Sequence, residues 1–179
     1  MLRSRVVAAR ERRSDADLAL AGDAIAAHGG AAWGRLQCVA AYAGTGGEPP
    51  TRALIDGLAD AGVRVLLPII DGDHLRWATY QGWRSLQPAS FGIPQPSVDD
   101  DQQLAAADSV IAPALAVDRS GHRLGRGRGY YDRALREVDP AAVVAIVFDD
   151  EVVDAVPVDP HDRPVGAVLT PTDGLRRLR

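Results

Sequence analysis

The sequence predicts an α/β fold, a single three-layer α/β/α domain with a mostly parallel central sheet. Apolar segments of strand length recur along the chain, separated by segments with helical periodicity. Two of these strands are joined through a loop and a helix, which is the order of a right-handed βαβ unit. The chain has 179 residues, about the length of one domain, and shows no repeat or linker. We therefore expect one domain over residues 1–179.

The first expected helix follows an arginine-rich start. Ser14 is placed to cap its N-terminus, and Asp15 and Asp17 suit its first turn, where the helix dipole favours acidic side chains. Apolar residues then recur at helical spacing, which predicts one buried face. We expect the helix to run through Ala27 and to stop at Gly29-Gly30.

A βαβ unit is expected next. Residues 36–42 predict a buried strand, and a polar, glycine-rich loop follows over residues 44–50. Thr51 can cap the following helix. Residues 63–67 predict a second strand, which Pro68 is expected to break.

The rest of the chain is predicted to supply the remaining strands and a long basic loop. We expect a hairpin around residues 75–80 and a short helix opening at Asp99. Residues 118–136 predict a loop that passes into a helix near Tyr130. Three further strands are expected at residues 109–112, 141–147 and 165–170.

The composition excludes several classes of protein. All twenty basic residues are arginine, so neither a lysine-containing P-loop nor Schiff-base chemistry is available. The net charge of -4 speaks against general nucleic-acid binding. The one cysteine, Cys38, cannot form an internal disulfide, and no apolar run reaches the length of a membrane span. We expect a cytoplasmic protein that does not associate with membranes.

The basic loop contains the clearest chemical signal. Between residues 118 and 136, six arginines and two aspartates give a local charge of +4. Gly125, Gly127 and Gly129 alternate with other residues, so the backbone can approach a ligand closely and present its N–H groups. This pattern favours a site for a polyphosphate. The alternative is a flexible, solvated loop.

Three acidic residues are candidates for ligand contacts. Asp132 and Asp162, near a polyphosphate, would suit Mg²⁺, although Asp132 could instead cap a helix end. Glu48 follows a strand, where open α/β sheets bind ligands, and could accept hydrogen bonds from the N–H groups of a heterocycle. Its alternative is a solvated loop acid. Residues 91–96 could form an apolar wall.

The motif Arg123-Leu-Gly-Arg-Gly-Arg-Gly-Tyr-Tyr-Asp132 resembles the signature of the 5-formyltetrahydrofolate cyclo-ligase family, also called 5,10-methenyltetrahydrofolate synthetases. Pro113-Ala-Leu-Ala-Val-Asp118 and Gly121 precede it, as in the family. Supporting matches span the chain: Leu2-Arg3, Glu48-Pro-Pro-Thr51, Leu66-Leu-Pro68, Gly92-Ile-Pro-Gln-Pro96, Val156-Pro157 and His161-Asp162.

The resemblance implies a three-layer α/β enzyme that depends on ATP and Mg²⁺. Its members convert 5-formyltetrahydrofolate to 5,10-methenyltetrahydrofolate and release ADP and phosphate. The implied partners are therefore these small molecules, with no nucleic acid and no membrane, and we expect a monomer.

The resemblance also assigns roles to residues of this sequence. Arg126 and Tyr130 are the implied catalytic residues, and Asp132 and Asp162 the implied Mg²⁺ ligands. The implied ATP contacts are Arg3, Arg123, Leu124, Gly125, Arg126, Gly127, Arg128, Gly129, Tyr130 and Tyr131. The implied folate contacts are Ala43, Glu48, Arg126, Gly127, Arg128, Gly129 and Tyr130, with Glu48 at the pterin end.

The sequence departs from the family pattern at two points. Relatives often have a phosphate-binding lysine shortly before the Leu2-Arg3 pair, and this sequence has no residue to match it. Arg128 replaces a lysine or small residue, which keeps a charge but makes it planar. Two other classes remain open: a non-catalytic nucleotide- or RNA-binding module, and a folate-binding relative without turnover.

Overall fold

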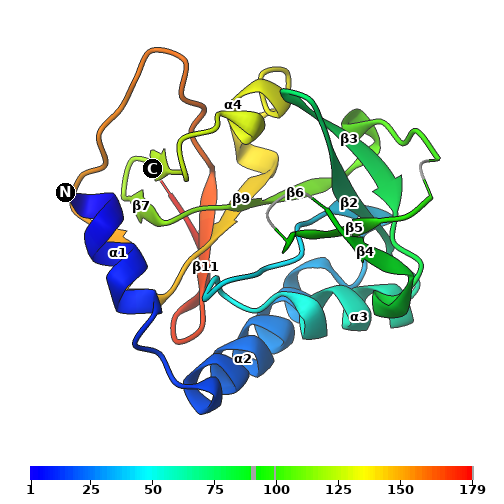
Figure 1. Cartoon of the computed structure of the whole chain (residues 1–179), viewed down its shortest axis with the longest axis horizontal. Helices are drawn as coiled ribbons and strands as arrows, with labels where there is room; N and C mark the ends of the chain where they lie inside the picture. The colour runs from blue at the N-terminus through cyan, green and yellow to red at the C-terminus, as the bar shows by residue number, and fades with distance from the viewer. Residues whose placement is uncertain (90–91, 99, 179) are drawn as a thin grey trace.

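A seven-stranded sheet in the order β12-β11-β9-β6-β1-β2-β3 runs through the computed structural model, which describes residues 1–89, 92–98 and 100–178 (Figure 1). The five inner strands, from β11 to β2, are mutually parallel, and β12 and β3 pair antiparallel at the two edges. The sheet strands are β1 (Cys38–Ala40), β2 (Arg64–Asp71), β3 (His74–Thr79), β6 (Ser109–Pro113), β9 (Val143–Ile146), β11 (Ala167–Thr170) and β12 (Gly174–Arg177). The expected α/β class and mostly parallel sheet are confirmed.

The helices lie on both faces of this sheet but are unequal in length. The two long ones, α2 (Asp15–Trp33) and α3 (Arg52–Asp60), cover one face, and the short α4 (Tyr130–Ala134) lies over the other (Figure 1). Alternate strand residues point to opposite faces. Val39 and Ile111 accordingly pack in the core beneath α2 and α3, whereas Ala40 and Val110 pack in the core that includes Leu135.

Smaller elements surround this framework. Helix α1 (Leu2–Arg10) lies at the side of the molecule and was not anticipated from its arginine-rich sequence (Figure 1). The shorter strands are β4 (Leu86–Pro88), β5 (Pro94–Pro96), β7 (Ala116–Asp118), β8 (Arg123–Leu124) and β10 (Val152–Val153). Short 3-10 helices are found at Trp83–Ser85, Leu104–Ala106, Pro140–Ala142 and Asp149–Glu151. Among the described residues, none of the helices is long and apolar enough to cross a membrane.

Helix α2 is longer than expected because its glycines do not stop it. Ser14 caps the N-terminus as expected, accepting a hydrogen bond from the Asp17 N–H at 3.2 Å. A Cβ on Gly29 would lie 2.4 Å from Leu54 Cδ1 and 2.9 Å from Trp33 Cζ3. Gly29 therefore lets α3 and the end of α2 pack closely, and the expected stop at Gly29-Gly30 is wrong.

Strand β2 continues through Pro68, contrary to expectation. In β2, every second residue from Val65 onward directs its backbone N–H and C=O groups toward β3. The Val65 carbonyl, for example, accepts a hydrogen bond from the Tyr80 N–H at 2.8 Å. Pro68 therefore directs its missing N–H to the opposite side, where pairing with β1 ends at Leu66. Proline is tolerated where no ladder bond is lost.

Helix α3 begins directly after Thr51, as expected, but the expected side-chain cap is not made. The Thr51 hydroxyl makes no cap bond to α3 and instead donates to the Tyr42 carbonyl oxygen at 2.6 Å. It also accepts from the Gly44 N–H at 2.9 Å, so it holds the turn that leaves β1. Asp99 lies outside the described residues, and Asp101 has a positive φ of 50°. The short helix of this region begins later, at Leu104.

Candidate active site

A cavity of about 700 Å³ opens where β1 and β6 end. These neighbouring parallel strands lie at a topological switch point. The chain leads from β1 to β2 on one side, and from β6 to β9 on the other side. Open α/β sheets bind ligands at such points. The cavity is lined by the loop after β1, by β2 and by the basic loop before α4.

Every residue singled out as a site residue from the sequence lines this one cavity. Helix α1, the loop after β1, the basic loop and the segment before β11 each contribute. The residues are Arg3, Ala43, Glu48, Arg123, Leu124, Gly125, Arg126, Gly127, Arg128, Gly129, Tyr130, Tyr131, Asp132 and Asp162. The fold thus brings together side chains that are up to 159 positions apart in the sequence, from residue 3 to residue 162.

Asp118 fixes the start of the basic loop. Its Oδ1 accepts hydrogen bonds from the N–H groups of Ser120 (2.9 Å) and His122 (3.0 Å), and its Oδ2 accepts one from Val156 N–H (3.1 Å). Burial acts to raise the pKa of Asp118, but these hydrogen bonds prevail and hold it below its ordinary value. The loop therefore begins from a rigid, ionised anchor.

Two glycines determine how the basic loop enters α4. Gly127 and Gly129 have positive φ values of 95° and 67°, which side chains rarely adopt. A Cβ on Gly129 would also lie 2.9 Å from Arg133 Nη1. The shape of the loop before α4 thus requires glycine at both positions. Because α4 has five residues, we expect little from its dipole.

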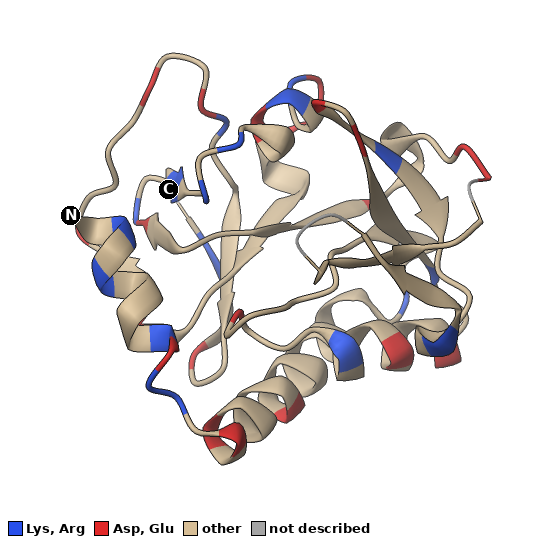
Figure 2. Cartoon of the chain, in the orientation of Figure 1, with Lys and Arg blue, Asp and Glu red and all other residues tan. Residues whose placement is uncertain are grey.

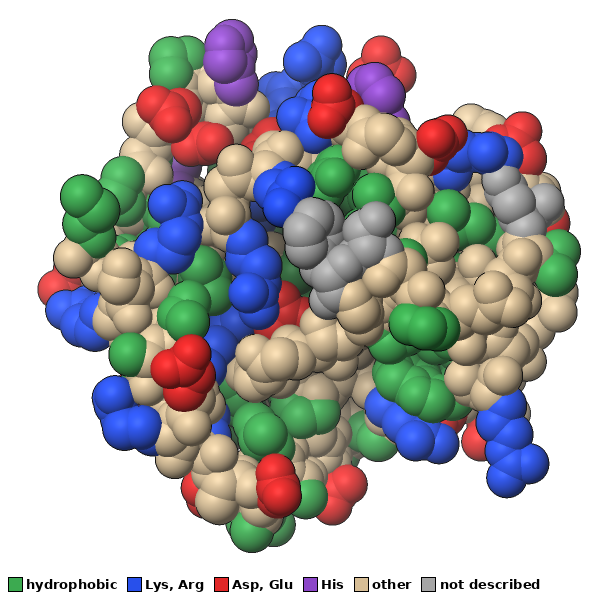
Figure 3. Space-filling view, in the orientation of Figure 1, with side chains coloured by type: hydrophobic (Ala, Val, Ile, Leu, Met, Phe, Trp, Pro, Cys, Tyr) green, Lys and Arg blue, Asp and Glu red, His purple; other side chains and the backbone are tan. Residues whose placement is uncertain are grey.

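Four arginines surround the cavity, each held differently. Arg3 of α1 donates from Nε to the Gly125 carbonyl at 3.1 Å. Arg123 is buried and donates from Nη2 to Asp132 Oδ1 at 2.7 Å, while its Nε has no hydrogen-bond partner among the described residues. Arg128 lines the cavity beside them. Basic residues occur on α1 and along the loop before α4 (Figure 2), and the space-filling view shows their side chains gathered around a hollow of this face (Figure 3).

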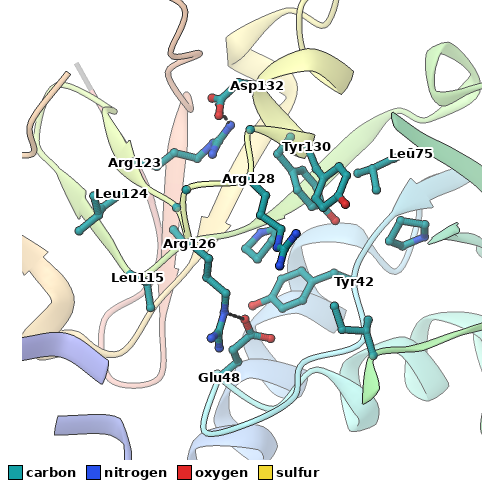
Figure 4. A pocket seen from close by; sticks show the side chains of 18 of the residues that line it. Tyr42, Glu48, Leu75, Leu115, Arg123, Leu124, Arg126, Arg128, Tyr130 and Asp132 are labelled. Carbon is teal, nitrogen blue, oxygen red and sulfur yellow. Dashed lines mark hydrogen bonds and ion pairs between the residues drawn. The ribbon is translucent and has the colours of Figure 1, made fainter. Parts of the chain in front are cut away.

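Arg126 joins the two sides of the cavity. Its Nε donates to Glu48 Oε1 at 3.0 Å, and Glu48 Oε2 accepts from the Thr45 N–H at 3.0 Å (Figure 4). The Arg126 side chain is 54% exposed and that of Glu48 is 13% exposed. Glu48 is therefore a fixed, partly buried acceptor and not a solvated loop acid.

The two candidate metal ligands lie on the same cavity wall but are not paired with each other. Asp132 Oδ1 accepts from Arg123 and, at 3.3 Å, from the Arg163 N–H. These partners lie outside α4, so Asp132 does not cap that helix. Asp162 Oδ2 accepts from the Asp159 N–H at 2.7 Å. Among the described residues there is no group of three His, Cys, Asp or Glu side chains that could hold a metal.

Sequence reasoning missed an apolar and aromatic part of the site. Tyr42, the second residue after β1, lines the cavity with its hydroxyl buried. The signal available was its position at the carboxyl end of a parallel strand. Ile93 also lines the cavity, in agreement with the expected apolar wall, whereas Phe91 lies outside the described residues. The other apolar lining residues include Pro68, Ile70 and Leu75.

The tyrosines after the basic loop are placed differently from each other. The Tyr130 hydroxyl donates to the Gly72 carbonyl oxygen at 3.3 Å, which ties the start of α4 to the β2–β3 turn. The Tyr131 hydroxyl is buried without a partner among the described residues, and its ring meets Trp77 edge to face at 6.3 Å. Burial and the charge of Glu48 raise the pKa of Tyr131, so this phenol is neutral at ordinary pH.

Comparisons with known proteins show the family of this chain. The model of the 5-formyltetrahydrofolate cyclo-ligase family matches residues 1–171. The chain is 44% identical over 155 residues to 5-formyltetrahydrofolate cyclo-ligase of Mycolicibacterium smegmatis, covering 82% of this chain and 78% of that protein. It is 34% identical over 141 residues to the protein of that name from Escherichia coli, covering 75% and 78%.

A solved structure extends the likeness to the whole fold. The structure of Aquifex aeolicus 5,10-methenyltetrahydrofolate synthetase superimposes with a TM-score of 0.86 at 26% identity, over 99% of this chain and 91% of that one. The Mycoplasma pneumoniae 5,10-methenyltetrahydrofolate synthetase, at 17% identity and a TM-score of 0.74, shares the fold. This chain belongs to the 5-formyltetrahydrofolate cyclo-ligase family.

Proposed function

We propose that the cavity is the active site of an ATP-dependent 5-formyltetrahydrofolate cyclo-ligase. The protein converts 5-formyltetrahydrofolate to 5,10-methenyltetrahydrofolate, with ATP giving ADP and phosphate. The observation that carries the assignment to this cavity is the Arg126–Glu48 contact of 3.0 Å. This contact joins the glycine- and arginine-rich loop, which we propose binds phosphate, to the carboxylate that we propose binds the N–H groups of the heterocycle.

The reaction needs activation of an unreactive carbonyl group. A formamide carbon is a poor electrophile, and its oxygen is a poor leaving group. The formyl oxygen attacks the γ-phosphorus, and ADP departs. N10 then attacks the activated carbon and loses its proton, and the former formyl oxygen leaves as part of phosphate. Such chemistry depends on positioning and charge stabilisation more than on a protein nucleophile.

The basic loop provides that stabilisation in our proposal. Gly125, Gly127 and Gly129 keep the backbone close to the cavity, and Arg123, next to them, is already oriented by Asp132. Arg3 of α1 adds a charge beside the loop, where it donates to the Gly125 carbonyl, and Arg128 adds a planar one. Arg126 is the residue best placed to follow the charge that moves from ATP to the formyl oxygen, because it is the more exposed partner of its ion pair.

The folate is proposed to bind on the Glu48 side. The Glu48 carboxylate is held by the Thr45 N–H, so its lone pairs have a fixed direction for the N–H groups of a pterin. Ala43 leaves room beside it, and Tyr130 borders the region between the pterin and the basic loop. Substrate binding would replace the Arg126 contact and release this guanidinium toward the phosphate.

The residues present fit a magnesium ion bound together with ATP. Mg²⁺ uses one or two carboxylates and completes its shell with phosphate oxygens and water. Asp132 and Asp162 provide two carboxylates on the cavity wall, and both hydrogen bonds to Asp132 use Oδ1. The ion would neutralise charge on the phosphates. We also propose that the protein is cytoplasmic and that it acts as a monomer; the monomer is supported by residues of one chain lining the described cavity.

The activity is tested with purified protein, 5-formyltetrahydrofolate and MgATP, following the methenyl product by absorbance and phosphate in parallel. We expect equal amounts of both products, and none when ATP is omitted or replaced by a non-hydrolysable analogue. Removing Mg²⁺ with a chelator should stop turnover, and adding it back should restore turnover. The proposal is wrong if ATP produces no methenyl product. Full activity without divalent metal would contradict the Mg²⁺ assignment alone.

A further inference from the structure

Tyr42 has a feature that the fold does not explain. The residue is 5% exposed, and its hydroxyl is buried with no hydrogen-bond partner among the described residues. Buried hydroxyls almost always have a partner, since leaving one unpaired is unfavourable. Because Tyr42 lines the cavity, its missing partner can be an atom of a bound ligand.

The phenol is a neutral donor in this setting. Burial raises its pKa well above the ordinary value, and the negative charge of Glu48 raises it further, while Arg10 opposes both. A neutral hydroxyl can donate a hydrogen bond to a carbonyl oxygen. A carboxylate such as that of Glu48 can only accept hydrogen bonds.

Tyr42 and Glu48 together present complementary groups. In Figure 4 the Tyr42 hydroxyl, the Glu48 carboxylate and the Arg126 guanidinium point toward the same part of the cavity. Glu48 accepts and Tyr42 donates, from a single loop that begins at the end of β1. The pyrimidine ring of a folate has a lactam edge, on which an N–H and a C=O are adjacent, so its pattern matches this pair.

We propose that Tyr42 is a substrate-binding residue whose hydroxyl donates to the lactam oxygen of the folate while Glu48 accepts from the neighbouring N–H. This inference rests on the proposed function and adds a specificity-determining residue to it. In this proposal the Tyr42 hydroxyl gains its hydrogen-bond partner only when the folate binds. The pair selects a ring with adjacent N–H and C=O groups.

The test compares Tyr42→Phe with Tyr80→Phe. Tyr80 is also buried, at 7% exposure, but its hydroxyl donates to Asp56, and it does not line the cavity. Each variant loses one hydroxyl. Tyr42→Phe loses no hydrogen bond of the fold, whereas Tyr80→Phe loses one. The affinity for 5-formyltetrahydrofolate is measured by calorimetry without nucleotide, and the thermal midpoint Tm by calorimetric scanning.

We expect the two variants to show opposite effects. Tyr42→Phe should weaken folate binding about 5- to 10-fold, the loss of one neutral hydrogen bond. Its Tm should stay within about 2 °C of the wild type or rise, and the KM for ATP should not change. Tyr80→Phe should lower Tm by about 2–4 °C and leave folate affinity unchanged.

Other results would overturn the inference. Unchanged folate affinity in Tyr42→Phe would show that the hydroxyl makes no contact with the substrate. A lowered Tm together with equal losses for folate and ATP would assign Tyr42 a structural role instead. The binding measurement needs no turnover, so a wild type that binds folate but forms no product would contradict the proposed function and leave the Tyr42 comparison decisive. A wild type that does not bind folate would overturn both.

Discussion

Two arginine–glutamate pairs in this molecule have the same chemistry and opposite surroundings. Arg10 donates to both carboxylate oxygens of Glu151, at 2.7 and 2.8 Å, with side-chain exposures of 3% and 2%. Arg126 donates once to Glu48, at 3.0 Å, with exposures of 54% and 13%. The first pair is buried at the C-terminal end of α1, whose last residue is Arg10, and the second bridges the cavity.

The difference shows which pair can be exchanged for a ligand. Arg10 also donates to the Ala114 carbonyl at 2.8 Å, and Glu151 accepts from the Phe148 N–H at 2.9 Å. Burial acts to lower the pKa of Arg10, but Glu151 prevails and raises it, so this guanidinium remains charged. It anchors α1, which brings Arg3 to the cavity. Glu48 is held by a backbone N–H in the same way, but Arg126 is 54% exposed and makes a single hydrogen bond to its glutamate, so this pair can open for substrates.

The largest effect is expected from breaking the buried pair. Glu151→Gln keeps the shape of the side chain but leaves the Arg10 charge buried and unpaired, so the free energy of unfolding should fall by about 3–5 kcal/mol. Urea denaturation of wild type and variant measures this change in the free energy of unfolding. Glu137→Gln, at an exposed position, is the control and should change stability by less than about 0.5 kcal/mol. A loss below about 1 kcal/mol at Glu151 would contradict the structural role.

The next effect concerns the exposed member of the cavity pair. Arg126→Ala should lower kcat by about 10²- to 10³-fold if the guanidinium stabilises the transferred phosphoryl group. The free energy of unfolding should change by less than about 1 kcal/mol, since the Arg126 side chain is 54% exposed. Steady-state kinetics on the variant test this. Arg119→Ala, exposed and outside the cavity lining, is the matched control. Near-normal turnover of Arg126→Ala would remove its catalytic assignment.

The smallest effect is expected from Glu48→Gln, the same substitution as Glu151→Gln but made in the cavity pair. Glu48→Gln should alter the free energy of unfolding by about 1 kcal/mol or less, because Arg126 stays exposed to solvent when it loses its partner. The KM for 5-formyltetrahydrofolate should instead rise about 10-fold or more through loss of a charged acceptor. Denaturation and kinetics are compared with Glu151→Gln. If both variants lost similar stability, the distinction between the pairs would be wrong.

The regular part of the fold could be predicted because its signals are local. The five parallel strands follow from apolar segments, and Ser14 follows from capping chemistry. The effects of Gly29 and Pro68 could not be predicted from the sequence, because they depend on elements that pack against or pair with these residues. A glycine stops a helix unless close packing requires it, and a proline breaks a strand unless its missing N–H faces an unpaired side.

The sequence by itself determined the α/β class, the family resemblance and the residue types of the site, because hydrophobic periodicity and the glycine–arginine motif are local properties of the sequence. Only the tertiary structure decided which charges meet. Arg126 contacts Glu48 across 78 positions, and Asp132 is already bonded to Arg123. It also left the Tyr42 hydroxyl buried without a hydrogen-bond partner among the residues that the structure describes. The physical reason is that burial and partnership are properties of the packed chain, and the same arginine–glutamate pair is an anchor at α1 and an exchangeable contact at the cavity.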